Sequence, residues 1–229
     1  MLNREQMQQR RRRIIYNDDG DAMFERVNPR AAEGPEGFLS ARFDHCKGSH
    51  VDSYVFCVGD GEWPPWSSVP GFVKPDALTD PFGVIIAACR KAGMEVMASL
   101  RMNDTHDSYA PKLTYRLKVE RPDLLVAPSR PAEEDSVLNL TWSSLDYSKR
   151  EVQDHRAEFI ERVARGWDWD GFELDFFRHG RHFPMGTDED NLGIMTAFVR
   201  RIRALLDRIG EERGRPYLLA VRAADSPEL

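Results

Sequence analysis

Two acidic residues lie inside an apolar segment of the chain, GWDWDGFELDFFRHG (166–180). They are Glu173 and Asp175, and Arg178 follows them. Burying an unpaired carboxylate costs several kcal/mol, so two acids in a segment with the apolar content of a buried strand require a reason. One reason is chemistry, because two carboxyl groups can work as an acid and as a base or nucleophile.

Alternation along a strand predicts how these acids are placed. Glu173 and Asp175 share one strand face with Gly171 and Phe177, while the other face carries Phe172, Leu174 and Phe176. In an open sheet both faces would meet helices, whereas in a closed barrel one face points inward and its top layer opens into the active site. We therefore expect Asp175 at the floor of a pocket and Glu173 one layer deeper, about 6.6 Å along the strand.

An arginine is expected to partner the deeper acid. Ser99, Arg101 and Asn103 alternate on one face of another apolar run. We predict that Arg101 pairs with Glu173 inside the barrel, which leaves Asp175 as the reactive group. The alternative is that both acids merely neutralise Arg101 and Arg178.

Short apolar runs alternate with helical patterns along the chain. Strands are predicted over residues 14–16, 53–58, 95–100, 172–176 and 217–221, and helices over 81–92, 150–165 and 187–209. Strands that alternate with helices indicate parallel βαβ units and an α/β fold of the (β/α)8 TIM-barrel type. Residues 112–146 are expected to form an elaborated loop after the third strand.

The domain organisation follows from this pattern. Residues 1–13 are expected to be a polar, basic N-terminal arm, and residues 14–229 a barrel domain. Five predicted strand-helix units, where a closed barrel needs eight, lead us to expect a barrel that is incomplete at its C-terminus.

Polar and aromatic residues follow the predicted strands, at the end where such folds place binding and catalysis. Carboxylates, amides, cationic groups and indole rings at this end can bind a polar substrate. The candidate substrate-binding residues are Asp18, Asp19, Asp60, Trp63, Trp66, Arg101, Asn103, Asp104, His106, Arg178 and Arg222. For the two aspartates before Gly20 the alternative is turn chemistry, and for the tryptophans it is loop packing against the adjacent prolines.

The segment WDWDGFELDFFR resembles the fourth-strand motif of (β/α)8 glycoside hydrolases. LDYSKREVQDHRAEFIERV (145–163) is similar to the helix that leads into this strand in the glycosyl-hydrolase-like 10 group. The resemblance covers residues 145–178 well. In residues 14–107 only the alternation of apolar runs with helical patterns and the segment RMNDTH fit. It implies a glycosidase that acts on a poly- or oligosaccharide.

The resemblance also bears on the catalytic residues. Asp175 is the first choice for a catalytic carboxylate, and Glu173 is the other candidate, although its depth puts it out of line with a bond at the barrel mouth. A chitinase-like barrel has a glutamate two residues after the last aspartate of its motif. Phe177 stands there in this chain, so a chitinase mechanism is not expected. Many such barrels take the second carboxylate from a later strand, here beyond Leu229.

Two other functions stay open. One is a non-catalytic carbohydrate-binding barrel with the same rim. The other is a metal-dependent polysaccharide deacetylase, because NDDGD resembles its Asp-Asp-Gly motif and would place Asp19 with His45 and His50. The two histidines precede the second strand, at the opposite mouth, and their spacing differs from the deacetylase motif. The favoured interpretation therefore includes no metal and no cofactor.

Composition limits the partners. A net charge of −6 argues against a broad nucleic-acid surface, and Arg10–Arg13 is expected to be a solvated patch. No apolar run is long enough to predict a membrane span, and three cysteines with irregular spacing predict reduced, mostly buried thiols. The N-terminus lacks the features of a signal peptide, so a cytoplasmic location is the default unless the true start lies upstream. The expected partner is a carbohydrate, and the oligomeric state is left open.

Overall fold

A five-stranded parallel sheet with the strand order β1-β2-β3-β4-β5 organises the chain. The computed structural model describes residues 3–20, 28–59, 61, 78–127, 129–130 and 138–224. The strands are β1 (Ile15–Asp18), β2 (Ser53–Cys57), β3 (Glu95–Arg101), β4 (Gly171–Asp175) and β5 (Leu218–Arg222). Each predicted strand is present and its ends lie within two residues of the prediction, which confirms the α/β class.

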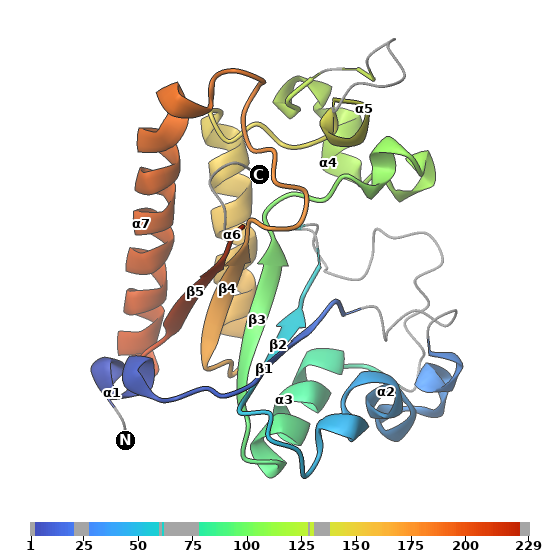
Figure 1. The fold of residues 1–229 in the computed structure, drawn as a ribbon, viewed down its shortest axis with the longest axis vertical. Coiled ribbons are helices and arrows are strands. Elements are labelled where there is room, and N and C mark those ends of the chain that lie inside the picture. Colours follow the sequence, from blue (N-terminus) through green and yellow to red (C-terminus); the bar gives the residue numbers. More distant parts are fainter. Residues whose placement is uncertain are drawn as a thin grey trace.

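Helices follow the strands and pack beside the sheet (Figure 1). The longer ones are α2 (Pro35–Arg42), α3 (Pro81–Lys91), α6 (Arg150–Gly166) and α7 (Asp188–Glu212). The short ones are α1 (Arg4–Gln9), η2 (Pro29–Glu33), η3 (Asp44–Cys46), η4 (His106–Ser108), η5 (Pro111–Leu113), α4 (Arg116–Glu120), η6 (Pro122–Leu124) and α5 (Leu138–Thr141). Helices α4 and α5 lie beyond the carboxyl end of β3, whereas α1 lies at the opposite end of the sheet (Figure 1).

A local sequence signal explains where α3 begins. Asp80 caps α3 because its Oδ1 accepts a hydrogen bond from the N–H of Gly83, with Pro81 in the first position. The predicted stop of α7 at Gly210 is wrong, since the helix continues to Glu212. A Cβ at Gly210 would lie 3.1 Å from the backbone nitrogen of Tyr217, so this glycine allows the next segment to approach closely.

The two faces of the sheet have different environments. The face toward the helices carries the main core, including Phe56, Leu100 and Leu174. The opposite face has a small apolar cluster of Val55, Met97 and Leu218, against which Met7 of α1 packs. Beyond this cluster the same face turns polar toward the carboxyl ends of the strands. We call it the concave face.

Hydrogen bonds across the concave face show that the sheet is curled. Nη1 of Arg222 on β5 donates to Oδ1 of Asn17 on β1 at 2.7 Å. Five strands laid flat would hold β1 and β5 about 19 Å apart, too far for an arginine and an asparagine side chain to meet. The strands therefore follow the curvature of a barrel wall and turn one face inward.

The expectation of a solvated basic arm at the N-terminus is wrong for Arg12. The Nε and Nη2 atoms of Arg12 bind the two carboxylate oxygens of Glu95 at 2.7 and 2.6 Å. The same guanidinium donates to the backbone oxygens of Met7 and Arg10. Glu95 is buried at the start of β3, and its charge requires this partner. The pairing fixes α1 at the amino end of the sheet.

Replacement of Arg12 tests this anchor. Arg12→Met keeps the length of the side chain but leaves the Glu95 carboxylate buried without its cation. We expect the free energy of unfolding to fall by about 2–3 kcal/mol. Denaturant unfolding followed by circular dichroism measures it. Arg11→Met, which removes the same charge from the exposed neighbouring position, is the control and should leave stability within about 0.5 kcal/mol of the parent. Equal stability of both variants would contradict the anchor.

Candidate functional site

The carboxyl ends of β3, β4 and β5 bring three charged side chains into one row. In the sheet register Arg101 lies opposite Asp175, and Asp175 lies opposite Arg222. One row deeper, Ser99 lies opposite Glu173. Side chains two residues apart on a strand share a face, so all five lie on the concave face.

Asp175 is buried, yet its two carboxylate oxygens differ in their partners. Oδ1 accepts hydrogen bonds from the backbone N–H groups of Phe177 (3.0 Å) and Arg178 (3.2 Å), and it lies 3.4 Å from Nε of Arg222. No donor in the described ranges reaches Oδ2, which is not a fully buried atom. The partners of Oδ1 thus fix the orientation of the carboxylate, while Oδ2 has no donor in the described ranges.

Glu173 lies in a neutral hydrogen-bonding environment. Its Oε1 accepts from Oγ of Ser99 (2.7 Å) and from Nδ2 of Asn17 (3.1 Å). Burial, the largest effect, raises the pKa of Glu173 above its usual value; the hydrogen bond from Ser99 opposes the shift, and the charge of Asp175 adds to it. A carboxyl group with a raised pKa is suited to carry a proton.

The predicted ion pair between Arg101 and Glu173 is wrong. Nη1 of Arg101 lies 3.0 Å from Oδ2 of Asp104, and its Nη2 lies 3.3 Å from Oδ1 of Asp19. Arg178 approaches the other oxygen of Asp19 at 3.7 Å. Arg101 starts one row nearer the mouth than Glu173, so its long side chain reaches the acids of the loops that follow β1 and β3.

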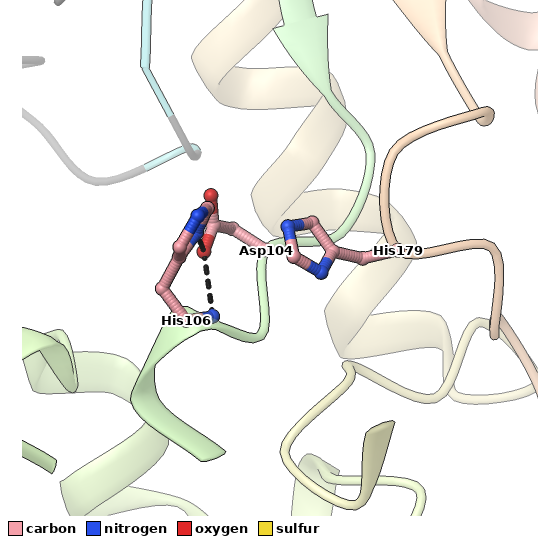
Figure 2. A group of neighbouring side chains, drawn as sticks. All are labelled: Asp104, His106 and His179. Atoms are coloured by element: carbon pink, nitrogen blue, oxygen red, sulfur yellow. Dashed lines mark hydrogen bonds and ion pairs between the residues drawn. The ribbon is translucent and has the colours of Figure 1, made fainter. Parts of the chain in front are cut away.

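Asp104, His106 and His179 form a group at the mouth (Figure 2). Oδ1 of Asp104 accepts from the backbone N–H of His106 (3.0 Å) and lies 2.6 Å from its ring Nδ1. The ring of His179 meets the ring of His106 edge-on, with centroids 4.8 Å apart. Figure 2 shows the ring of His179 turned toward the Asp104–His106 pair. Two loops that are far apart in the sequence therefore supply one cluster of potential ligands.

Charge and burial set the protonation of this group. Burial alone would raise the pKa of Asp104, but the hydrogen bond from His106 and the charges of His106 and Arg101 outweigh it and hold that pKa well below its usual range. Burial lowers the pKa of His179 to about 4, so its imidazole is neutral at pH 7. His179 also has a left-handed backbone, with φ of 54°, which is uncommon for a residue other than glycine.

A buried lysine braces the loop that carries Asp104 and His106. Nζ of Lys118, in α4, donates to the backbone oxygen of Asp104 and to Oδ1 of Asp107 at 2.9 Å. Ser143 donates to the same oxygen of Asp107 at 2.8 Å. A paired, buried ammonium group of this kind holds the loop in one conformation, so the side chains at the mouth are pre-positioned.

Two predicted binding residues lie inside the protein. Asp18 is 1% exposed, accepts hydrogen bonds from the Tyr54 hydroxyl and the Gly20 N–H, and points away from the concave face. Asn103 is fully buried and binds the backbone of Leu145 through both its oxygen and its nitrogen. Both side chains hold the loops in place, and the structure does not bring them to the mouth.

The remaining predicted residues divide into two groups. Asp19, Arg101, Asp104, His106, Arg178 and Arg222 come together at the mouth through the contacts above. Asp60, Trp63 and Trp66 lie outside the described residues.

The ligand set of the deacetylase hypothesis is not assembled within the described ranges. His45 and His50 are exposed and precede β2, at the amino end of the sheet. The ring of His45 packs edge-on against Tyr16, with centroids 5.1 Å apart. Asp19 follows β1 at the opposite end and binds Arg101.

Sequence reasoning missed the role of Asn17. The first strand was predicted to stop at Tyr16, but β1 continues to Asp18 because its last residues pair with β2. Asn17 thereby becomes an inward-facing strand residue that joins Glu173 to Arg222. Extending the alternation of β1 by one residue would have revealed it. The role of His179 had no such signal, since only the fold brings it to the loop after β3.

No helix in the described part of the chain has the length and apolar character needed to cross a membrane. No family model matches the chain, and no curated protein matches its sequence. The resemblance to the glycosyl-hydrolase-like 10 group therefore stays a prediction.

Solved structures of glycoside hydrolases are similar to the chain. The galactosidase domain of an α-galactosidase–sucrose kinase is 16% identical with a TM-score of 0.49, over 94% of this chain and 27% of that chain. A GH36 α-galactosidase from Geobacillus stearothermophilus is 16% identical with a TM-score of 0.48, over 92% and 28%. α-L-Fucosidase isoenzyme 2 from Paenibacillus thiaminolyticus is 17% identical with a TM-score of 0.49, over 92% and 32%. The chain thus spans about a third or less of these structures.

The raised pKa of Glu173 predicts a pH-dependent effect on stability. A carboxyl group whose pKa is higher in the folded state stabilises the fold below its unfolded pKa and loses this contribution as pH rises through the folded value. Glu173→Gln keeps an oxygen that accepts from Ser99 and Asn17 but cannot ionise. We expect it to melt higher than the parent at pH 8 and nearly alike at pH 4.

Differential scanning calorimetry across this pH range measures the difference. Glu158→Gln, which removes an exposed acid of α6, is the matched control and should show no such trend. A Glu173→Gln variant that is less stable than the parent at pH 8 would show that the ionised group is well accommodated.

Proposed function

We propose that the chain is part of a glycoside hydrolase in which Asp175 is a catalytic carboxylate. The observation that supports this most directly is the contrast between its two oxygens. Three donors orient Oδ1, whereas Oδ2 has no donor in the described ranges and is not fully buried at the carboxyl end of β4. A carboxylate kept only to balance charge would be expected to use both oxygens.

Glu173 is the second carboxyl group of the proposal. It is the residue two positions before Asp175 on the same face, which corresponds to about 6.6 Å between Cα atoms. Glycosidases hold their two carboxyl groups about 5–9.5 Å apart, depending on stereochemical outcome. Burial favours the protonated form of Glu173, and the Arg222 guanidinium lies beside Asp175. In the proposed division of roles, Glu173 carries the proton and Asp175 is the carboxyl group nearer the mouth.

The mouth is proposed to bind the sugar. Asp19, Arg101, His106, Arg178 and Arg222 are all partly exposed there and offer both donors and acceptors. Asp60, Trp63 and Trp66 remain part of the proposed substrate-binding set. Asp18 and Asn103 leave it, because their side chains are buried among protein partners.

Asp175→Asn tests the proposal. The amide oxygen still accepts from the Phe177 and Arg178 N–H groups, so we expect the melting temperature to change by only a few degrees. We expect kcat on a panel of aryl glycosides and oligosaccharides to fall by about 10²–10⁴-fold, the range typical for the loss of an acid–base group. Rates and melting curves are measured on the same preparations.

Two comparisons complete the experiment. Asp44→Asn makes the same chemical change at an exposed site near the amino end of the sheet and should keep the parental rate. A variant that melts much earlier but keeps its rate per folded molecule would make Asp175 a structural residue. Sugar binding without turnover in the parent would instead favour the non-catalytic carbohydrate-binding barrel.

A further inference from the structure

Three side chains at the mouth take no part in the proton transfer of the proposed hydrolysis. Asp104 and His106 belong to the loop after β3, and His179 belongs to the loop after β4. One potential ligand atom from each lies within 4.8 Å of the others. From this juxtaposition we propose that Asp104, His106 and His179 bind one divalent transition-metal ion, for which zinc is the best match. Two imidazoles and a carboxylate form a common zinc ligand set.

Each imidazole is oriented through its Nδ1 atom. Nδ1 of His106 lies 2.6 Å from Oδ1 of Asp104, and Nδ1 of His179 lies 2.7 Å from Oγ1 of Thr105. An imidazole that donates Nδ1–H to an oxygen carries its lone pair on Nε2. Metal-binding histidines are usually held in this way by a second group behind them. Nε2 of His179 is thus the nitrogen left for an ion, whereas an ion shared by Asp104 and His106 would replace the contact between Oδ1 of Asp104 and Nδ1 of His106.

Nε2 of His179 lacks a partner in the part of the chain that the structure describes. It is a fully buried polar atom, and no hydrogen bond reaches it there. A buried nitrogen without a partner is unfavourable, and most such atoms in proteins are satisfied. The ring is turned toward the Asp104–His106 pair (Figure 2). A metal ion between the two loops would satisfy this nitrogen.

The surrounding charges allow Asp104 to turn toward an ion. Oδ2 of Asp104 accepts a hydrogen bond from Nη1 of Arg101 at 3.0 Å. Arg101 has a second partner in Asp19 at 3.3 Å, and its charge stays balanced when Asp104 is drawn to the metal. Ligand atoms around a tetrahedral zinc ion lie about 3.3 Å apart, so small side-chain rotations suffice to close the site.

The proposed site would leave one coordination position of the ion open. Three protein ligands leave one position of a tetrahedral ion for water, as in catalytic zinc sites. The brace from Lys118 to the backbone of Asp104 holds one loop, and the β4 strand holds the other. This departs from the expectation of a metal-free mouth.

Binding is tested with the purified protein after treatment with a chelator. We expect titration with Co²⁺ to give the visible absorption of a tetrahedral or five-coordinate site at one equivalent, and Zn²⁺ to displace it. Isothermal titration calorimetry with Zn²⁺ gives the affinity. His106→Ala and His179→Ala should each weaken it by at least tenfold. His50→Ala, which removes an exposed histidine at the other end of the sheet, should bind like the parent.

The outcomes are separable from folding and from catalysis. His179→Gly, which suits the left-handed backbone, repeats the test if the alanine variant melts early. The site is overturned if replacement of either histidine leaves the affinity unchanged. It is also overturned if the parent binds no better than a variant that carries both His106→Ala and His179→Ala. No substrate is present in these measurements, so failure of the glycosidase proposal leaves the result unaffected.

Discussion

The amide of Asn17 is the contact on which the geometry of the mouth depends. It donates to the Glu173 carboxyl and accepts from the Arg222 guanidinium, so one side chain of β1 connects β4 and β5. An ionised aspartate at this position would have no N–H to donate to Glu173, and a lysine would have no oxygen for Arg222. A neutral group with both a donor and an acceptor is what the curled sheet needs at this point.

The two aspartates at the ends of β4 differ in how many of their oxygens have hydrogen-bond donors. Asp170, just before the strand, is buried like Asp175, but both of its oxygens have donors. Oδ1 binds Arg215 at 2.8 Å, and Oδ2 binds Arg90 at 2.5 Å and the N–H of Val96 at 2.9 Å. At the other end Asp175 leaves one oxygen without a donor in the described ranges. Ion pairs thus occupy both oxygens of the aspartate at the amino end of β4, whereas the aspartate at its carboxyl end has one oxygen without a donor in the described ranges.

Much of the fold followed from periodicity, because apolar runs and helical stripes are local properties of the sequence. The alternation in β4 placed Glu173 and Asp175 on one face correctly. The partner of Arg101 did not follow, since the reach of a long side chain depends on where neighbouring loops end. The burial of Asn103 could not be predicted either, because the backbone that it binds at Leu145 lies 42 residues away in the chain.

The backbone of His179 has a consequence for the balance between stability and chemistry. A left-handed conformation costs a histidine about 1 kcal/mol that a glycine would not lose. Selection for heat resistance alone would therefore favour a glycine in place of His179. That replacement would remove one of the imidazoles that face the mouth. A variant designed for higher thermal stability should therefore keep this turn unchanged and carry its stabilising substitutions in the helices on the far side of the sheet.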